Sequence, residues 1–150
     1  LVVLVLGALL LTVILIVADQ LVKHWVVAHI ALGASQPFLG NLVALTNLHN
    51  DGAAWSILAG QQWLFTVITV VALLAELFFA WRWRRQPRLL APLCLIIAGT
   101  IGNFIDRLQN GYVVDMFELL FINFPVFNLA DCCFTVGVLW LLVIVVREED

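Results

Sequence analysis

The sequence predicts an all-α membrane protein with four transmembrane helices, a small extracytoplasmic β-like cradle and both termini in the cytoplasm. Its 150 residues are 64% hydrophobic, only 17 are charged, and the mean hydropathy is +1.10. A soluble domain carries about a quarter charged residues. The net charge of −3 excludes a nucleic-acid-binding module, and the three cysteines match no disulfide framework or metal-ligand spacing. We therefore expect one integral-membrane domain over residues 1–150, without metal or cofactor.

The four spans follow from the length of the apolar stretches. A helix needs about 20 apolar residues to cross the bilayer core. Four stretches meet or approach that length: 1–18, 63–81, 89–105 and 127–146. We expect the first to be a span, not a cleaved signal peptide, because no basic segment precedes it and charged residues directly follow it.

The distribution of basic residues predicts the orientation. Four arginines lie between the second and third spans and Arg147 follows the fourth, so five of the seven basic residues share one side. Basic flanks mark the cytoplasmic side of a membrane protein. The loops at 24–62 and 106–126 are then extracytoplasmic. Glycines alternate with short apolar runs in the first loop, which predicts a small sheet or cradle on the membrane surface.

Acidic residues gather on the opposite side from the arginines. Eight charged residues, six of them acids, fall at the outer ends of the spans or in the outer loops: Asp19, Lys23, Asp51, Asp106, Arg107, Asp115, Glu118 and Asp131. Charges near membrane depth are costly and are usually functional. Glu76 stands apart inside the second span, and we expect it to reach the interface or to pair with a nearby arginine.

Two motifs flank the first outer loop. In Asp19-Gln-Leu-Val-Lys23 an acid and a base stand one helical turn apart, which predicts an ion pair at the end of the helix. In the run from residue 47 to 55, Asn50 offers a donor and an acceptor to a peptide, and Gly52 lets a backbone approach closely. A plain loop with an aromatic anchor, Trp55, is the alternative. His49 is expected at the surface and not as a metal ligand.

The third span ends in a polar run. Ala98 and Gly102 have the spacing that permits close helix packing. Asn103, Asp106 and Arg107 follow at i, i+3 and i+4. We expect Arg107 to pair with Asp106 and cap the helix, a structural role that leaves Asn103 without an explanation.

Two further acids predict chemistry. Asp115 ends a short β-like run, and Asp131 lies one turn after Asn128 at the start of the fourth span. An Asp in the first turn of a helix stabilises the helix dipole, so Asp131 has a purely structural alternative. Two carboxylates that face one dry pocket cannot both ionise, however, and they supply a general acid and a general base. This pair predicts attack of water on an amide.

Other functions are less well supported by the residues. A Ser56–Lys23 dyad has no local signature, and the three cysteines are expected to pack in apolar surroundings. A small transporter or proton relay that uses the same acids is the main alternative. The lack of an internal inverted repeat and the gathering of acids at one face count against it. A non-enzymatic membrane scaffold is the second alternative.

The chain carries five motifs in a specific order: D-Q-x-x-K, N-x-G-A-A-W, G-N-x-x-D-R, V-V-D and F-N-x-A-D. On a four-span chain this ordered set resembles the lipoprotein signal peptidase (signal peptidase II) family, from about Asp19 to Asp131. The resemblance implies a multi-pass aspartyl protease of the bacterial inner membrane, with its active site on the extracytoplasmic side. It implies cleavage of diacylglyceryl-modified prolipoproteins just before the lipidated cysteine. Membrane phospholipid is the other expected partner, and we expect a monomer.

The resemblance also assigns residues. Asp115 and Asp131 match the catalytic pair, of which one ionised Asp takes a proton from water and the other, protonated, donates to the scissile carbonyl. Residues that match supporting positions around the pair and the peptide are Asp19, Asn50, Gly52, Asn103, Asp106, Arg107 and Asn128. Lys23 matches the basic residue of the first motif and is expected to be structural. The chain departs from the family pattern at Ala98, Met116 and the Cys132-Cys133 pair, and none of these replaces a carboxylate.

Overall fold

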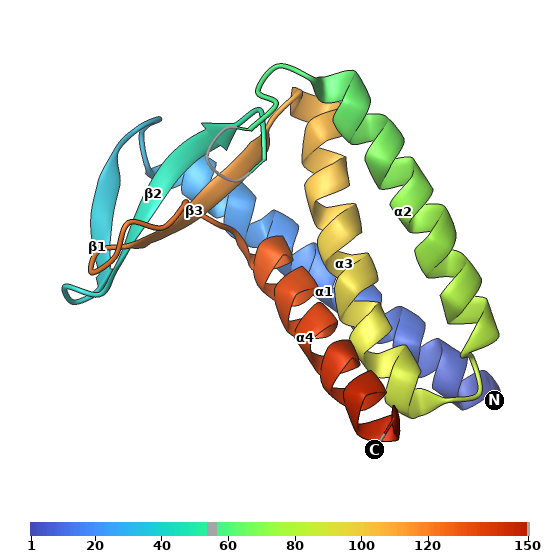
Figure 1. Cartoon of the computed structure of the whole chain (residues 1–150). Helices are drawn as coiled ribbons and strands as arrows, with labels where there is room; N and C mark the ends of the chain where they lie inside the picture. The colour runs from blue at the N-terminus through green and yellow to red at the C-terminus, as the bar shows by residue number, and fades with distance from the viewer. Residues whose placement is uncertain (54–56, 150) are drawn as a thin grey trace.

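The computed structural model describes residues 1–53 and 57–149, which form a helical bundle with a small sheet at one end (Figure 1). The helices and strands in chain order are α1 (Val2–His29), β1 (Ser35–Leu39), β2 (Val43–Asn50), α2 (Gln62–Arg82), α3 (Pro87–Asn110), β3 (Val113–Leu119) and α4 (Leu129–Glu149). The sheet is antiparallel with the order β1-β2-β3. Helix α1 begins and α4 ends at the end of the bundle opposite the sheet.

Each of the four helices is long and apolar enough to cross a membrane, which confirms the four predicted spans. The largest difference concerns α1, which continues to His29, whereas the apolar stretch was expected to end at residue 18. Asp19 and Lys23 are buried inside the bundle and pair with each other, so the helix does not have to end where its charges begin. The first outer loop is therefore shorter than predicted.

Glycines set how closely α3 and α4 approach. A Cβ on Gly99 would clash with the carbonyl oxygen of Ala130, and a Cβ on Gly137 would lie 2.7 Å from the carbonyl oxygen of Pro92. Gly102 is a close-packing position as predicted, since a Cβ there would lie 2.7 Å from Asp19 Oδ2. Small residues matter here because two helices in lipid associate through close packing and hydrogen bonds.

A β-bulge interrupts the pairing of β2 with β3. Leu45 pairs with Phe117, but the next pair is Leu48 with Asp115, so two residues of β2 stand opposite one residue of β3. The bulge is held by Asn47, whose Nδ2 donates to the carbonyl oxygen of Ile30 at 2.8 Å. Side chains alternate along a strand, so the extra residue changes which of them share a face. Because of it, Asn50, the last residue of β2, lies on the same face of the sheet as Asp115.

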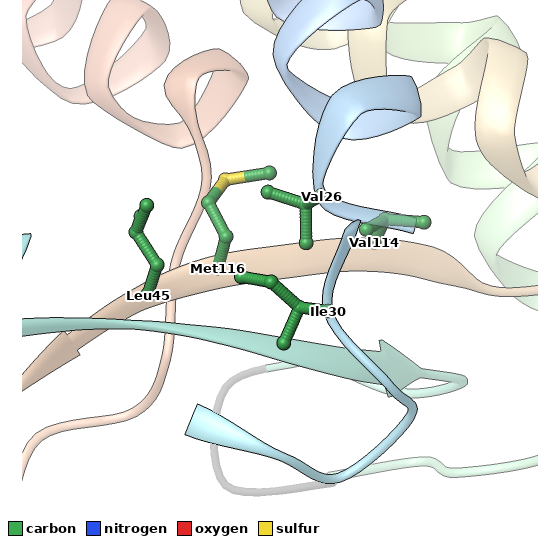
Figure 2. Packing of buried hydrophobic residues seen from close by; sticks show 5 residues of the cluster. All are labelled: Val26, Ile30, Leu45, Val114 and Met116. Atoms are coloured by element: carbon green, nitrogen blue, oxygen red, sulfur yellow. The ribbon is translucent and has the colours of Figure 1, made fainter. Parts of the chain in front are cut away.

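The end of α1 supports the sheet through a small apolar core. Figure 2 shows Val26 of α1 and Ile30, which directly follows that helix, packed against Leu45 of β2 and against Val114 and Met116 of β3. Met116, one of the departures from the family pattern, is fully buried, and its flexible side chain fills this position in the core. The longer α1 therefore determines where β3, and with it Asp115, lies.

Glu76 does not behave as predicted. Among the described residues, no ion pair joins it to an arginine. Instead it is buried against α3, where its Oε1 accepts a hydrogen bond from Thr100 Oγ1 at 2.7 Å. The side chain faces the neighbouring helix and bonds to a hydroxyl group there, which explains the difference.

The glycine packing gives a stability prediction. Gly99→Ala should lower the free energy of unfolding by about 1 to 3 kcal/mol, because the added methyl group forces α3 away from α4. Thermal unfolding of the purified protein in detergent measures the change. Gly7→Ala is the matched control, since a Cβ there meets nothing within 4 Å. Equal stability of the two variants would contradict the close approach at Gly99.

Candidate active site

Asn128 and Asp131 form a reciprocal cap at the start of α4. The backbone N–H of Asp131 donates to Asn128 Oδ1 at 2.8 Å, and the backbone N–H of Asn128 donates to Asp131 Oδ2 at 3.1 Å. This is the hydrogen-bond pattern of a capping box. Asp131 therefore has the structural position that was predicted as its alternative, in the first turn of α4, but this position accounts for only one of its two carboxylate oxygens. Its other oxygen, Oδ1, accepts from Asn103 Nδ2 at 2.8 Å, which a cap does not require.

Asp115 reaches the same site from β3. Its Oδ1 accepts from Asn128 Nδ2 at 2.8 Å and its Oδ2 accepts from Asn50 Nδ2 at 3.0 Å. The side chain is 2% exposed. Burial, reinforced by the negative charge of Asp131, raises the pKa of Asp115 to about 7. Asn128 thus contacts both carboxyl groups, which the sequence had placed 16 residues apart.

Both carboxyl groups line a cavity of about 600 Å³. Its polar end also contains Asn50, Asn103 and Arg107. Most of the remaining wall is apolar: Val113, Phe124, Pro125, Val126, Phe127, Phe134 and Val136. The volume is typical of a ligand site. Such a cavity can hold an apolar peptide segment and place one polar bond against the two acids.

Lys23 lies at the centre of a buried ion-pair cluster. Its Nζ is 2.9 Å from Asp19 Oδ2 and 3.1 Å from Asp106 Oδ2, and the lysine side chain is 2% exposed. This confirms the ion pair predicted from the D-Q-x-x-K motif, although the pair lies within α1 and not at its end. These contacts agree with the structural role expected of Lys23.

The two acids of this cluster hold the backbone next to the candidate catalytic residues. Asp106 Oδ2 accepts from the backbone N–H of Val114 at 3.0 Å, and Asp19 Oδ1 accepts from the backbone N–H of Ala130 at 2.9 Å. Val114 directly precedes Asp115 and Ala130 directly precedes Asp131. One lysine therefore fixes the chain immediately before both carboxylates.

Lys23 also fixes the orientation of Asn103. Its ammonium group donates to Asn103 Oδ1 at 3.1 Å. A lysine cannot accept a hydrogen bond, so the amide oxygen of Asn103 must face it and the Nδ2 group is left to donate to Asp131. Gln20 completes the cluster, since its Nε2 donates to Asp106 Oδ1 at 2.9 Å. Sequence reasoning gave Gln20 no role, although its place in the first motif was a usable signal.

The predicted pairing of Arg107 with Asp106 is wrong. Asp106 pairs with Lys23, and no ion pair joins Arg107 to it in the part of the chain that the structure describes. The guanidinium of Arg107 lies over the ring of Phe65 in α2, 4.9 Å from its centroid, and lines the cavity. Neighbouring residues point about 100° apart on a helix, so Asp106 faces α1 while Arg107 faces α2. Phe65 was missed because nothing in its local sequence marks it.

The turn after β2 orients Asn50. The backbone N–H of Gly52 donates to Asn50 Oδ1 at 3.0 Å, so the Nδ2 group is left to face Asp115. Gly52 is buried and lines the cavity. The remaining motif residue Trp55 and the alternative nucleophile Ser56 lie outside the described residues. His49 is half-buried and stacks on Tyr112, with ring centroids 3.9 Å apart, so it is less exposed than predicted.

The three cysteines differ in their surroundings. Cys94 and Cys133 are buried, as expected for packing residues. Cys132 is only partly buried and lines the cavity next to Asp131, so its predicted packing role is incomplete.

Two acids at one cavity of a membrane-spanning bundle are the arrangement expected of a membrane aspartic endopeptidase, and the family match places the chain in that class. Residues 11–147 match the family model described as Signal peptidase (SPase) II. The chain belongs to this family, as its motifs had suggested.

Individual relatives agree with this assignment. The chain is 54% identical over 142 residues to the lipoprotein signal peptidase of Lactiplantibacillus plantarum, with 95% of each chain covered. It is 47% identical over 135 residues to the lipoprotein signal peptidase of Lactococcus lactis subsp. lactis, with 90% of each covered. A solved structure described as a bacterial membrane enzyme matches with a TM-score of 0.92 at 30% identity, covering 96% of this chain and 90% of that one. A second gives 0.88 at 30% identity, with 95% and 94% covered.

The buried cluster gives a second stability prediction. Lys23→Met should lower the free energy of unfolding by about 3 to 5 kcal/mol, because it leaves Asp19 and Asp106 buried without their cation. Chemical or thermal unfolding in detergent measures this. Arg85→Met, which removes a cation from an exposed turn, should have little effect. Similar losses in both variants would show that the cluster does not stabilise the bundle.

Proposed function

We propose that this chain removes the signal peptide from diacylglyceryl-modified prolipoproteins, with Asp115 and Asp131 as the catalytic pair. The observation that carries the proposal is the contact of one residue, Asn128, with both carboxyl groups at the apolar cavity. Its Nδ2 donates to Asp115 Oδ1 and its backbone N–H donates to Asp131 Oδ2. The family and the names of the relatives supply the substrate class. The lipid-modified peptide would lie along the apolar wall, with its scissile bond at the polar end.

The surroundings of the two acids support different protonation states. Asp131 caps α4, where the positive end of the helix dipole favours a carboxylate. Asp115 lies on a strand, is buried, and has a pKa of about 7, raised by burial and by Asp131. In our proposal, Asp131 is the ionised base and Asp115 holds the proton at neutral pH.

The reaction then needs neither a covalent intermediate nor a metal. Asp131 takes a proton from a water molecule while the water oxygen attacks the carbonyl carbon before the lipidated cysteine. Asp115 gives its proton to the carbonyl oxygen, which neutralises the charge that develops there. When the tetrahedral intermediate collapses, the C–N bond breaks, Asp131 returns its proton to the leaving nitrogen, and Asp115 recovers its proton from the hydroxyl group.

The polar residues around the pair act as positioning residues in this scheme. Asn50, Asn103 and Asn128 are each held at their amide oxygens, so their Nδ2 groups are directed at the carboxylates. Fixed donors reduce the reorganisation needed in the transition state. Arg107 and Gly52 line the cavity where the peptide backbone would bind.

We also infer the placement in the membrane. The arginine-rich turn between α2 and α3 lies at the end of the bundle opposite the sheet (Figure 1), as does the end of α4. By the positive-inside rule this end is cytoplasmic and both termini are there. The active site then faces the extracytoplasmic side of the bacterial inner membrane. We further propose that residues 1–150 form a single peptidase domain that acts as a monomer and contacts membrane phospholipid.

Removing either carboxylate should strongly reduce the rate of catalysis. Asp115→Asn and Asp131→Asn should each lower kcat by about a hundredfold to ten-thousandfold, the usual contribution of a general acid or base. Cleavage of a lipidated prolipoprotein by the purified variants measures the loss. Glu118→Gln is the matched control, because it makes the same change on the same strand three residues away and lies outside the cavity. Full activity of either Asp variant would refute the catalytic pair.

The raised pKa of Asp115 predicts the pH dependence. Asp115 carries its proton below its pKa of about 7 and loses it above, so kcat/KM should fall as pH rises through that value. The hydrogen bond from Asn50 lowers this pKa, so Asn50→Ala should move the alkaline limb to higher pH as well as reduce the rate. Rates measured between about pH 5 and pH 9 provide the test. An alkaline limb that stays in place in the Asn50 variant would contradict the assignment of the proton.

A further inference from the structure

Glu76 is a buried acid that the proposed reaction does not use. It lies in the second half of α2 and is 8% exposed. Its Oε1 contacts Thr100 Oγ1 of α3 at 2.7 Å, while its Oε2 is buried and has no hydrogen-bond partner among the described residues. An acid at membrane depth is costly, and this one is not explained by an ion pair.

The hydrogen atoms around Thr100 indicate the protonation state of Glu76. Thr100 Oγ1 lies 3.0 Å from the carbonyl oxygen of Ile96 as well as 2.7 Å from Glu76. A hydroxyl group has one hydrogen and can donate to only one of these oxygens. Both contacts are satisfied if Thr100 donates to Ile96 and Glu76 brings its own hydrogen, which it donates to Thr100 Oγ1. A neutral acid also avoids the cost of a charge in apolar surroundings.

Helix α2 depends on such contacts more than the other helices do. It lies along α3 at the side of the bundle (Figure 1), and of its residues only Thr69 and Glu76 are buried. Lipid is as apolar as the helix surface, so no hydrophobic effect drives α2 onto α3, and interhelical hydrogen bonds and packing must hold it there. The Glu76–Thr100 hydrogen bond is a directional contact of this kind.

The position of α2 matters for the cavity because its outer end carries Phe65. The ring of Phe65 lies against the guanidinium of Arg107, which lines the cavity together with Asp131. We propose that Glu76, as a protonated acid, donates a hydrogen bond to Thr100 and so holds α2 against α3 with Phe65 on Arg107. Glu76 is then a positioning residue: it affects the active site through Phe65 and Arg107. Its kinetic consequence rests on the proposed function.

The first experiment tests the hydrogen bond itself. Glu76→Leu and Thr100→Val each remove it, and each should lower kcat/KM for a lipidated prolipoprotein about threefold to tenfold, the effect of one interhelical hydrogen bond. Glu76→Gln keeps a neutral donor of the same shape. It should stay within about twofold of the parent protein and keep its pH–rate profile. A Gln variant as impaired as the Leu variant, or a shifted pH profile, would overturn the proposal.

The second experiment tests the route to the active site. If Glu76 acts by keeping Phe65 on Arg107, Glu76→Leu should add little to the loss of kcat/KM caused by Phe65→Leu. Phe65→Leu already removes the ring contact with Arg107 that Glu76→Leu would displace. A general weakening of the fold would instead make the two losses multiply. Multiplied losses, or parental activity in Glu76→Leu, would overturn the positioning role.

Failure of the proposed function is distinguishable from failure of this inference. A parent protein that cleaves no prolipoprotein refutes the function and leaves the hydrogen bond testable through thermal unfolding of the Glu76→Leu, Thr100→Val and double variants. Non-additive stability losses support the bond, because either change removes it completely. Additive losses overturn it.

Discussion

The buried ammonium group of Lys23 is the interaction on which the rest of the site depends. A lysine inside a membrane-spanning bundle is costly unless its charge is paired and its hydrogens are bonded. Here Asp19 and Asp106 supply the counter-charges and Asn103 an acceptor. The same two acids bind the backbone directly before Asp115 and Asp131. Three helices and one strand are therefore joined at a single cation, and the positions of Asp115 and Asp131, the proposed catalytic pair, follow from that junction.

Around this junction, the two aspartates Asp115 and Asp131 lie in different surroundings, which is the basis of the different roles proposed for them. Asp131 begins a helix and is bound by a backbone N–H group, which favours its charge. Asp115 is enclosed on a strand, where burial raises its pKa. Asn128 joins the two and is itself fully buried. Such a network is useful only when each amide has its orientation fixed, because a flipped amide would present an oxygen to a carboxylate. The fixed orientations make the site a preorganised one.

The helices are held together by different means. At the crossing of α3 and α4, Gly99 and Gly137 let the backbones approach, and the glycine Gly102 brings Asp19 of α1 against α3. This part of the bundle is closely packed, so even one added methyl group would have to displace a helix. Helix α2 has no such glycine contact among the described residues and relies on polar groups such as Glu76. The packing of α1, α3 and α4, which holds the acids, and the packing of α2 against α3 beside the cavity are thus stabilised by different interactions.

The sequence by itself determined the spans, the location of the acids and the motif residues of the site. Apolar length and charge count are properties of contiguous residues, and they specify what can cross a membrane. The tertiary structure decided which residues meet. In the folded chain Asp106 pairs with Lys23 and not with Arg107, and Glu76 contacts Thr100. A bulge in β2 places Asn50 next to Asp115. These outcomes depend on the direction of each side chain on its helix or strand and on partners far away in the chain, which local patterns do not encode.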